Sequence, residues 1–322
     1  MKNLGPCLLE MKSEKIKKTV IITGYRCNNL CRFCVDANKR NLIEKTTSEI
    51  ISEMAEARRR GRTYLEIIGG EQTIRTDIVD IIKFAKKLGF EVITMATNGR
   101  MLSYRGFARE IIAAGLNQVI FSIHGHTQKL HDSLTQSEGS FKQLLQGLKN
   151  IKELGVTKIG SNTTIVKQNY RSLFEIGNFL YSLKIRNAEF IFVDPTRGGA
   201  YDYFNELVPR ISEAAPFIRK CLEIGREKQV KHWHIRYVPL CHFLGYESQI
   251  SELHEQNIFQ TEHLAPDFKN FSVEASRRQI GRIKPDKCRM CKKYALCEGI
   301  WVEYYKRYGD EELIPIRGPD VV

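Results

Sequence analysis

Hydrophobic residues follow two alternating patterns along the chain from about residue 18. Short runs rich in Val, Ile, Phe and Thr end at or near Gly, Asn or Pro, which is typical of buried parallel strands. These runs span residues 19–25, 63–70, 90–99, 118–125, 158–166 and 188–195. Between them, apolar residues recur every three to four positions, as on one face of a helix. The sequence therefore predicts six consecutive strand–helix units.

The predicted helices have recognisable ends. One carries its apolar face from Ile78 to Leu88 and stops at Gly89, and another runs from Phe141 to Gly155. Glycine is a common helix terminator because it adopts the left-handed conformation without strain. Thr47 is the expected N-cap of the helix that follows the first strand.

This order of elements predicts an α/β fold with a parallel sheet covered by helices and right-handed crossovers. An open sheet and a curved barrel both fit, and we expect a partial (β/α)6 TIM-like barrel. In either form, ligands bind at the carboxyl ends of the strands. After about residue 225 the alternation fails, and prolines and cysteines predict a small annex that ends in an aromatic helix over 299–309. We therefore divide the chain into residues 1–225 and 226–322.

Composition indicates a cytoplasmic enzyme. The 50 Lys and Arg residues exceed the 37 Asp and Glu residues, which gives a net charge of +13. That surplus favours polyanionic or acidic partners, although a generally basic surface explains it equally well. No apolar run approaches the roughly 18 residues that span a bilayer, so no membrane partner is expected. Nine cysteines without a recognisable secretory signal indicate metal or redox chemistry rather than disulfides.

Three cysteines stand directly after the first predicted strand. Cys27, Cys31 and Cys34 have the spacing C-x3-C-x2-C, and three thiolates on one loop could hold three corners of a 4Fe–4S cluster. Electron-transfer clusters take four cysteines, so the fourth iron here would be free to bind another group. Three unrelated cysteines or a partial zinc knuckle are the alternatives, but zinc sites usually recur as paired C-x2-C units.

Short polar motifs close the next strands. Gly69-Gly70-Glu71 ends the second strand, where two glycines let the backbone approach a ligand and the carboxylate of Glu71 could accept a hydrogen bond from an ammonium group. Thr97-Asn98-Gly99 and Ser122-Ile123-His124-Gly125 end the third and fourth strands. The glycine-rich motif alone would indicate only a turn with a solvated carboxylate.

Together with the cysteine triplet, these motifs resemble the radical S-adenosylmethionine (radical SAM) enzymes over residues 18–200. The resemblance implies that the open iron chelates SAM and that reductive cleavage of SAM gives a 5′-deoxyadenosyl radical, which takes a hydrogen atom from the substrate. It assigns the SAM-binding 4Fe–4S cluster to Cys27, Cys31 and Cys34. It assigns the SAM contacts to Phe33, Gly69, Gly70, Glu71, Asn98, Ser122, His124 and Asn162.

Several of these assignments have structural alternatives. His124 fits a hydrogen-bonded structural histidine equally well, and Asn162 could be a satisfied core asparagine. Phe33 could simply pack within its loop. The chain also departs from the family pattern at Gln72, where Pro usually follows the Gly-Gly-Glu motif.

The annex contains a second cysteine set. Cys288, Cys291 and Cys297 have the spacing C-x2-C-x5-C, and Cys241 lies upstream. Four thiolates form a closed shell that suits either tetrahedral zinc or a 4Fe–4S cluster. The arrangement resembles the SPASM and Twitch extensions of radical SAM enzymes, which implies an auxiliary 4Fe–4S cluster. Cys221 could replace Cys241 as the fourth ligand or donate a hydrogen atom to a substrate radical, although a buried packing role is its default. Cys7 is expected to be incidental.

The resemblance implies an electron donor such as flavodoxin or ferredoxin and a peptide or small-molecule substrate. Maturation of a ribosomal peptide is our first interpretation, with small-molecule or cofactor biosynthesis second. The first strand begins near residue 19, so no separate leader-peptide domain is expected, which weakens the peptide case.

Two further interpretations remain open. Modification of tRNA is motivated only by net charge, because the basic string at 58–62 is better explained as a solvated helix end. A non-catalytic iron–sulfur or zinc protein would need four ligands for each centre, and the triplet has three.

Overall fold

The computed structural model describes residues 14–318, and its centre is one sheet of nine strands. The strand order is β7-β6-β5-β4-β3-β2-β1-β8-β9, and every neighbouring pair is parallel except β8 and β9. The strands are β1 (Ile16–Ile22), β2 (Tyr64–Ile68), β3 (Val92–Thr97), β4 (Gln118–Ser122), β5 (Lys158–Ile165), β6 (Asn187–Phe192), β7 (His232–Arg236), β8 (Phe259–Leu264) and β9 (Lys269–Asn270).

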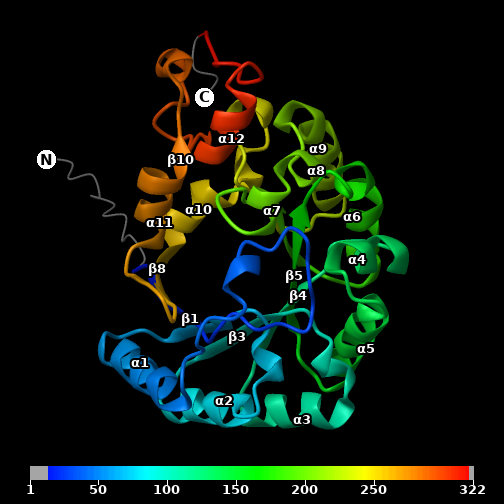
Figure 1. The fold of residues 1–322 in the computed structure, drawn as a ribbon, viewed down its shortest axis with the longest axis vertical. Helices are drawn as coiled ribbons and strands as arrows, with labels where there is room; N and C mark the ends of the chain where they lie inside the picture. Colours follow the sequence, from blue (N-terminus) through cyan, green and yellow to red (C-terminus); the bar gives the residue numbers. More distant parts are fainter. Residues whose placement is uncertain (1–13, 319–322) are drawn as a thin grey trace, which may run out of the picture.

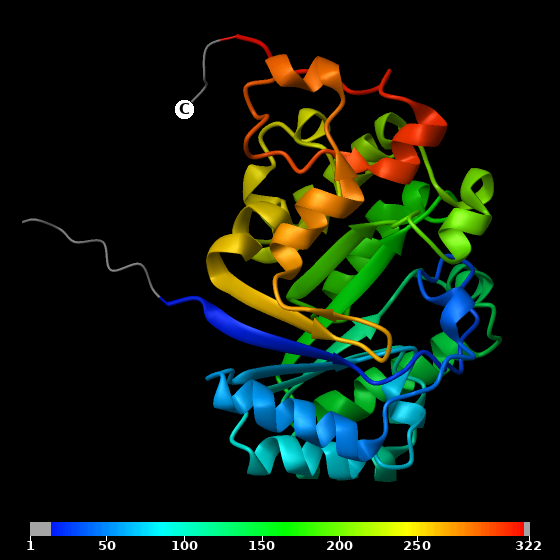
Figure 2. The ribbon, with the colours of Figure 1, turned by 60° about the vertical axis from the view of Figure 1, so that its left-hand side comes forward.

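Helices cover the outer side of this curved sheet, as Figure 1 shows for α1, α2, α3 and α5. The longer helices are α1 (Thr47–Arg59), α2 (Ile78–Lys87), α3 (Arg105–Ala114), α4 (Gln128–Thr135), α5 (Ser140–Glu153), α6 (Leu173–Ser182), α9 (Ile211–Glu227) and α10 (Ser251–Ile258). Shorter ones are α7 (Gly199–Asp202), α8 (Phe204–Leu207), α11 (Val273–Ser276) and α12 (Val302–Tyr308). A small antiparallel pair, β10 (Arg282–Ile283) and β11 (Ile300–Trp301), lies in the annex, whose orange-to-red C-terminal part occupies the top of Figure 2.

Each barrel strand divides its residues between two environments. In β2, Leu65 and Ile67 are fully buried in the core, whereas Tyr64, Glu66 and Ile68 line a central cavity. This alternation follows from the two-residue period of a strand. The hydrophobic core therefore lies between sheet and helices, and the inside of the barrel is lined by charged and apolar side chains together, such as Glu66 and Ile68.

Three strands of the main sheet, β7, β8 and the short β9, come from the region where the sequence showed no strand–helix alternation. β7 extends the sheet beyond β6, and β8 pairs with β1 from the other side. Their inward positions hold His234, Arg236 and His263, which line the cavity. Because those residues are polar, the hydrophobic runs that mark β1 to β6 are absent from β7 and β8. The aromatic segment at 299–309 forms β11 and α12.

The N-terminus of α1 differs by one residue from its prediction. Thr46, not Thr47, is the N-cap: its hydroxyl accepts a hydrogen bond from the Glu49 amide (3.2 Å), and the Glu49 carboxylate accepts one from the Thr46 amide (2.7 Å). This reciprocal pair is a capping box. Its sequence signature is a Thr followed three residues later by Glu, which Thr46 meets.

The basic string after α1 is used inside the molecule. Arg58 and Arg62 donate to backbone carbonyl groups, and Arg62 is buried against Glu262 of β8, 3.1 Å away. The interpretation of a solvated helix end is therefore wrong for Arg62. Within residues 14–318 we find no helix with the length and apolar character needed to cross a membrane.

Candidate active site

The cysteine triplet lies on the loop after β1, at the carboxyl ends of the strands. Cys27, Cys31 and Cys34 are all half-buried. The Asn29 amide donates to the Cys27 sulfur (3.3 Å), and the Cys34 amide donates to the Cys31 carbonyl (3.2 Å). Amide hydrogen bonds to sulfur stabilise thiolates that bind iron, so this loop suits a three-thiolate cluster site.

Glycines on two neighbouring turns let the backbone press against this loop. A Cβ on Gly70, after β2, would lie 2.1 Å from the Arg26 carbonyl oxygen. After β6, a Cβ on Gly199 would lie 1.8 Å from the Arg32 carbonyl oxygen, and the Gly199 amide donates to the Cys34 carbonyl (2.9 Å). No larger residue fits at such distances. The loop is thus clamped from both sides.

Gly198-Gly199 and Arg100 are site residues that the sequence reasoning missed. The glycine pair is a doublet like Gly69-Gly70, but it lies several residues after the end of β6 at Phe192, whereas Gly69 directly follows β2. Arg100 donates to the Asn28 carbonyl and to the Asn29 side chain, 2.9 Å away, so it fixes the part of the loop between Cys27 and Cys31. A single arginine after a turn has no spacing that would single it out.

Glu71 is held by several hydrogen bonds in the turn after β2. The carboxylate is 3% exposed and accepts hydrogen bonds from the Thr97 hydroxyl (2.7 Å), the Asn98 amide (2.7 Å) and the backbone and side chain of Thr73. Burial raises the pKa of Glu71, while these hydrogen bonds oppose that rise. Its oxygens join the turns after β2 and β3, and the assignment of Glu71 as a SAM contact stays a prediction.

The other expected SAM contacts fall into two groups. Asn98 directly follows β3 and Ser122 ends β4, whereas Asn162 lies within β5. The Asn98 side chain donates to Asn28 (2.7 Å), and Ser122 pairs in register with Asn162, which lines the cavity. His124 and Phe33 are buried and meet edge-on with ring centroids 4.8 Å apart. The Thr164 amide donates to the His124 ring (3.2 Å), and burial, together with His131, lowers the His124 pKa to about 3. Both fit the packing alternatives.

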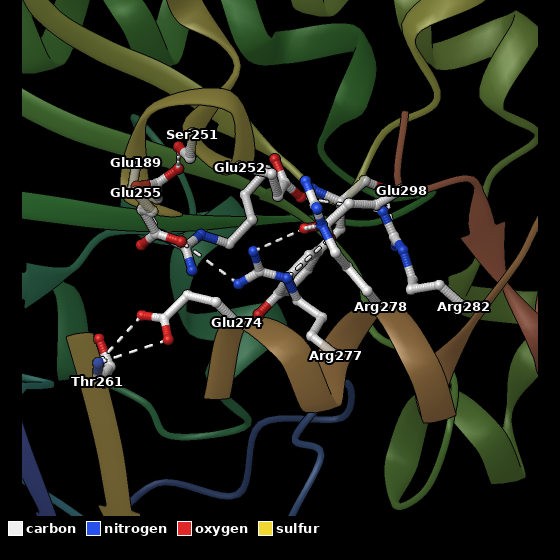
Figure 3. A network of polar contacts seen from close by, with 12 residues as sticks. Glu189, Ser251, Glu252, Glu255, Thr261, Glu274, Arg277, Arg278, Arg282 and Glu298 are labelled. Carbon is white, nitrogen blue, oxygen red and sulfur yellow. Dashed lines mark hydrogen bonds and ion pairs between the residues drawn. The ribbon is translucent and has the colours of Figure 1, made fainter. Parts of the chain in front are cut away.

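The barrel encloses a cavity of about 1070 Å³. Its Lys and Arg side chains all make ion pairs: Lys18 with Glu66, Arg197 with Asp36 (3.1 Å), Arg236 with Glu189 and Glu255, and Arg277 with Glu255 (3.3 Å) and Glu298 (2.8 Å). Figure 3 shows Arg277 between these two carboxylates. Asp194 and Glu274 add negative charge to the lining. The cavity therefore offers paired cations and several carboxylates.

The structure brings the four annex cysteines together. Cys241, Cys288, Cys291 and Cys297 line one small apolar hollow. The Gly299 amide donates to the Cys297 sulfur (3.3 Å), and the Ile316 amide donates to the Cys291 sulfur (3.4 Å). In the described part of the chain, no three His, Cys, Asp or Glu side chains converge on one ion position. A 4Fe–4S cluster does not need such convergence, because each thiolate binds its own iron and the four sulfurs surround the cluster.

Cys221 lies away from both cysteine sets. It is 1% exposed in α9, and its sulfur would meet a Cβ on Gly177 of α6 at 2.9 Å. This position between two outer helices contradicts both functional roles suggested for Cys221, because neither the cavity nor the annex hollow includes it. The buried packing role is the one that fits. Cys7 lies outside the described residues.

We expect cluster assembly to accelerate with pH. Burial raises the pKa of all three loop thiols, to about 11 for Cys27, so the metal-free protein holds them protonated at neutral pH. Iron binds the thiolate, whose fraction rises about tenfold per pH unit below the pKa. The raised pKa also means that the metal-free fold loses stability as pH rises toward 11. The growth of cluster absorbance at pH 7, 8 and 9 measures the effect, and a rate that falls with pH would contradict it.

Comparison with known proteins decides the family. The sequence signature of the Radical SAM superfamily matches residues 21–180, which include the cysteine loop and the ends of β2 to β5. The chain belongs to the radical SAM superfamily. This radical SAM protein is therefore an enzyme of a family that uses SAM and a 4Fe–4S cluster.

Its sequence relatives and structural neighbours differ in kind. Proteins named probable GTP 3′,8-cyclase are 25% identical over 221 residues in Saccharolobus solfataricus (68% of this chain, 69% of the relative) and 25% identical over 199 residues in Sulfolobus acidocaldarius (62% and 63%). Streptococcus suis SuiB bound to its precursor peptide SuiA has a TM-score of 0.66 at 16% identity, covering 91% of this chain and 73% of SuiB. The enzyme anSMEcpe with bound AdoMet and the Cp18Cys peptide has a TM-score of 0.65 at 12% identity, covering 94% and 92%. The fold likeness extends through the annex.

Proposed function

We propose that this radical SAM enzyme modifies a peptide inside its barrel. The main observation is the cysteine loop, which is clamped by Gly70 and Gly199. Asp36, two residues after Cys34, pairs with Arg197 of the cavity lining (3.1 Å), and annex residues such as Arg277 and Trp301 line the same cavity. Cys27, Cys31 and Cys34 would hold the SAM-binding cluster. When bound, the cluster and SAM supply one-electron chemistry that ends in removal of a hydrogen atom from the substrate.

The protein's own residues would bind and orient. We assign the SAM amine to the turn of Gly69, Gly70 and Glu71, in which the Glu71 carboxylate accepts hydrogen bonds from Thr73, Thr97 and Asn98 and so fixes the turn. Asn98, Ser122 and Asn162 present amide and hydroxyl groups along neighbouring strands. The annex covers the cavity and excludes water from a reactive species.

The annex would hold the second cluster on Cys241, Cys288, Cys291 and Cys297. Their shared hollow and the amide donors to two of the sulfurs support this assignment. Residues 1–225 would form the catalytic core and residues 226–322 the auxiliary unit. Because β7 and β8 also complete the main sheet, we expect the two parts to fold together.

Charge favours a peptide over a nucleoside triphosphate. Each guanidinium or ammonium group in the cavity lining already has a carboxylate partner, and Asp194 and Glu274 would repel phosphate groups. A peptide needs hydrogen-bond partners rather than free cations. The fold likeness to two enzymes with bound peptides supports the same choice.

Cyclisation of a purine nucleotide is the second candidate. The observation in its favour is the sequence similarity to GTP 3′,8-cyclases, which covers about two thirds of the chain. This candidate requires unpaired cationic side chains for the phosphates. Arg236 and Arg277 both form ion pairs with Glu255, which argues against it.

The test is anaerobic reconstitution followed by reduction in the presence of SAM. We expect 5′-deoxyadenosine to form slowly without substrate, and GTP neither to bind in calorimetry nor to accelerate its formation. Peptides encoded by neighbouring reading frames provide the positive arm, with mass spectrometry of the product. Stimulation by GTP would support the second candidate. Failure of a fully loaded sample to cleave SAM would overturn the proposal.

A further inference from the structure

The turn between β8 and β9 belongs to residues 226–322 and contacts the two ends of the cysteine loop. Asp267, on that turn, accepts a hydrogen bond from the Tyr25 hydroxyl, and its other oxygen pairs with the Lys39 ammonium at 2.6 Å. Tyr25 lies two residues before Cys27, and Lys39 lies five residues after Cys34. One carboxylate therefore joins both ends of the segment that carries the cysteine triplet.

Packing around Asp267 fixes this contact. Tyr25 is 2% exposed and belongs to a small apolar cluster, separate from the main core, with Ile22 and Ala265; Phe268 packs against it. The Lys39 ammonium lies over the rings of Tyr25 (5.0 Å) and Phe268 (5.6 Å). Such cation–π contacts restrict where the ammonium can be. The turn thus contacts the loop through the apolar side chains of Ala265 and Phe268 and through the ion pair of Asp267 with Lys39.

The turn itself is anchored at two places. The Ala265 amide donates to the Phe268 carbonyl (2.8 Å), and β9 pairs with the end of β8, which is hydrogen-bonded to β1. Lys269 also reaches Glu53 of α1 (3.4 Å), the same carboxylate that binds Lys45. Because the turn is held against β1 and α1 by these contacts, it can restrain the cysteine loop.

We propose that Asp267 is a positioning residue for the cysteine loop and that the β8–β9 turn is a clasp which keeps the three thiolates in register for the cluster. The proposal rests on the proposed cluster site at Cys27, Cys31 and Cys34. The two turns that clamp the loop, after β2 and β6, come from residues 1–225. The clasp adds a contact from the other part of the chain, so the annex half would support the first cluster as well as its own.

The test compares Asp267→Ala and Tyr25→Phe with the wild-type chain. The alanine variant loses both hydrogen bonds, and the phenylalanine variant loses one and keeps the ring. We expect iron from the loop cluster to pass to a chelator at least about tenfold faster in Asp267→Ala, which loses two charge-assisted hydrogen bonds, and less so in Tyr25→Phe, since one such bond is worth about a factor of ten. We also expect a changed EPR spectrum when SAM is added to the reduced protein, and faster tryptic cleavage of the metal-free loop at Lys39.

Glu206→Gln is the matched control. Glu206 pairs with Arg32 of the same loop from α8, but its side chain is 57% exposed, so its removal should change none of these readouts. A purely structural role for Asp267 would lower the melting temperature while the iron-release rate and the EPR spectrum stay as in wild type, and that result would overturn the proposal. A wild-type chain that takes up no loop cluster would instead refute the proposed function.

Discussion

Replacing Cys34 with alanine is expected to abolish 5′-deoxyadenosine formation, whereas replacing Cys291 with alanine is expected to leave SAM cleavage measurable. Both changes should lower the iron content from about eight to about four atoms per chain, since each 4Fe–4S cluster depends on its thiolates. SAM cleavage should differ because Cys27, Cys31 and Cys34 supply three ligands and so leave one iron open for SAM. The four annex cysteines would leave no open iron. Iron analysis and chromatography of the nucleoside products on the same samples provide the measurement.

Cys221→Ser is the control for both variants. Cys221 is fully buried between α6 and α9, so the serine hydroxyl should lower thermal stability by about 1–3 kcal/mol without changing iron content or deoxyadenosine yield. Loss of SAM cleavage in Cys221→Ser, at full iron loading, would restore the hydrogen-donor role that its position contradicts. Loss of SAM cleavage in Cys291→Ala would mean that the auxiliary site is needed for the first electron.

The sequence predicted those parts of the fold that depend on local pattern. Six strands with apolar runs and the helices between them occur where expected, because outward residues such as Leu65 and Ile67 must be buried in the core. β7 and β8 were missed for the opposite reason. Their inward residues line a polar cavity, and their place beside β6 and β1 depends on contacts between residues far apart in sequence.

The candidate site residues also divide into those with a local sequence signal and those that depend on tertiary contacts. Cysteine spacing identified the two candidate ligand sets because each lies largely within one short segment. Arg100 and Asp267 act through tertiary contacts with the cysteine loop, and single residues of that kind have no sequence signal. The sequence also does not show that Thr73, Thr97 and Asn98 converge on the carboxylate of Glu71.

Gly199→Ala is expected to destabilise the cysteine loop more than any single polar change described above. The new methyl group would lie 1.8 Å from the Arg32 carbonyl oxygen and 3.5 Å from the Cys34 amide. Both are backbone atoms, so the clash is relieved only if α7 or the cysteine loop moves. Overpacking of this kind costs about 1–3 kcal/mol or more, and here the displacement falls on a cluster ligand. We expect loss of the loop cluster and of SAM cleavage, with the annex cluster retained.

Gly106→Ala, the same substitution at a site without a clash, is expected to stabilise the protein. Gly106 lies in α3, nothing lies within 4 Å of its added Cβ, and alanine should stabilise the helix by about 0.5–1 kcal/mol. Iron content, deoxyadenosine yield and melting temperature of the two variants therefore separate a local backbone clash from a general effect of the methyl group. Full loop-cluster occupancy in Gly199→Ala would show that the turn after β6 does not hold the cysteine loop, and the clamp would then have to come from Gly70 and the β8–β9 turn alone.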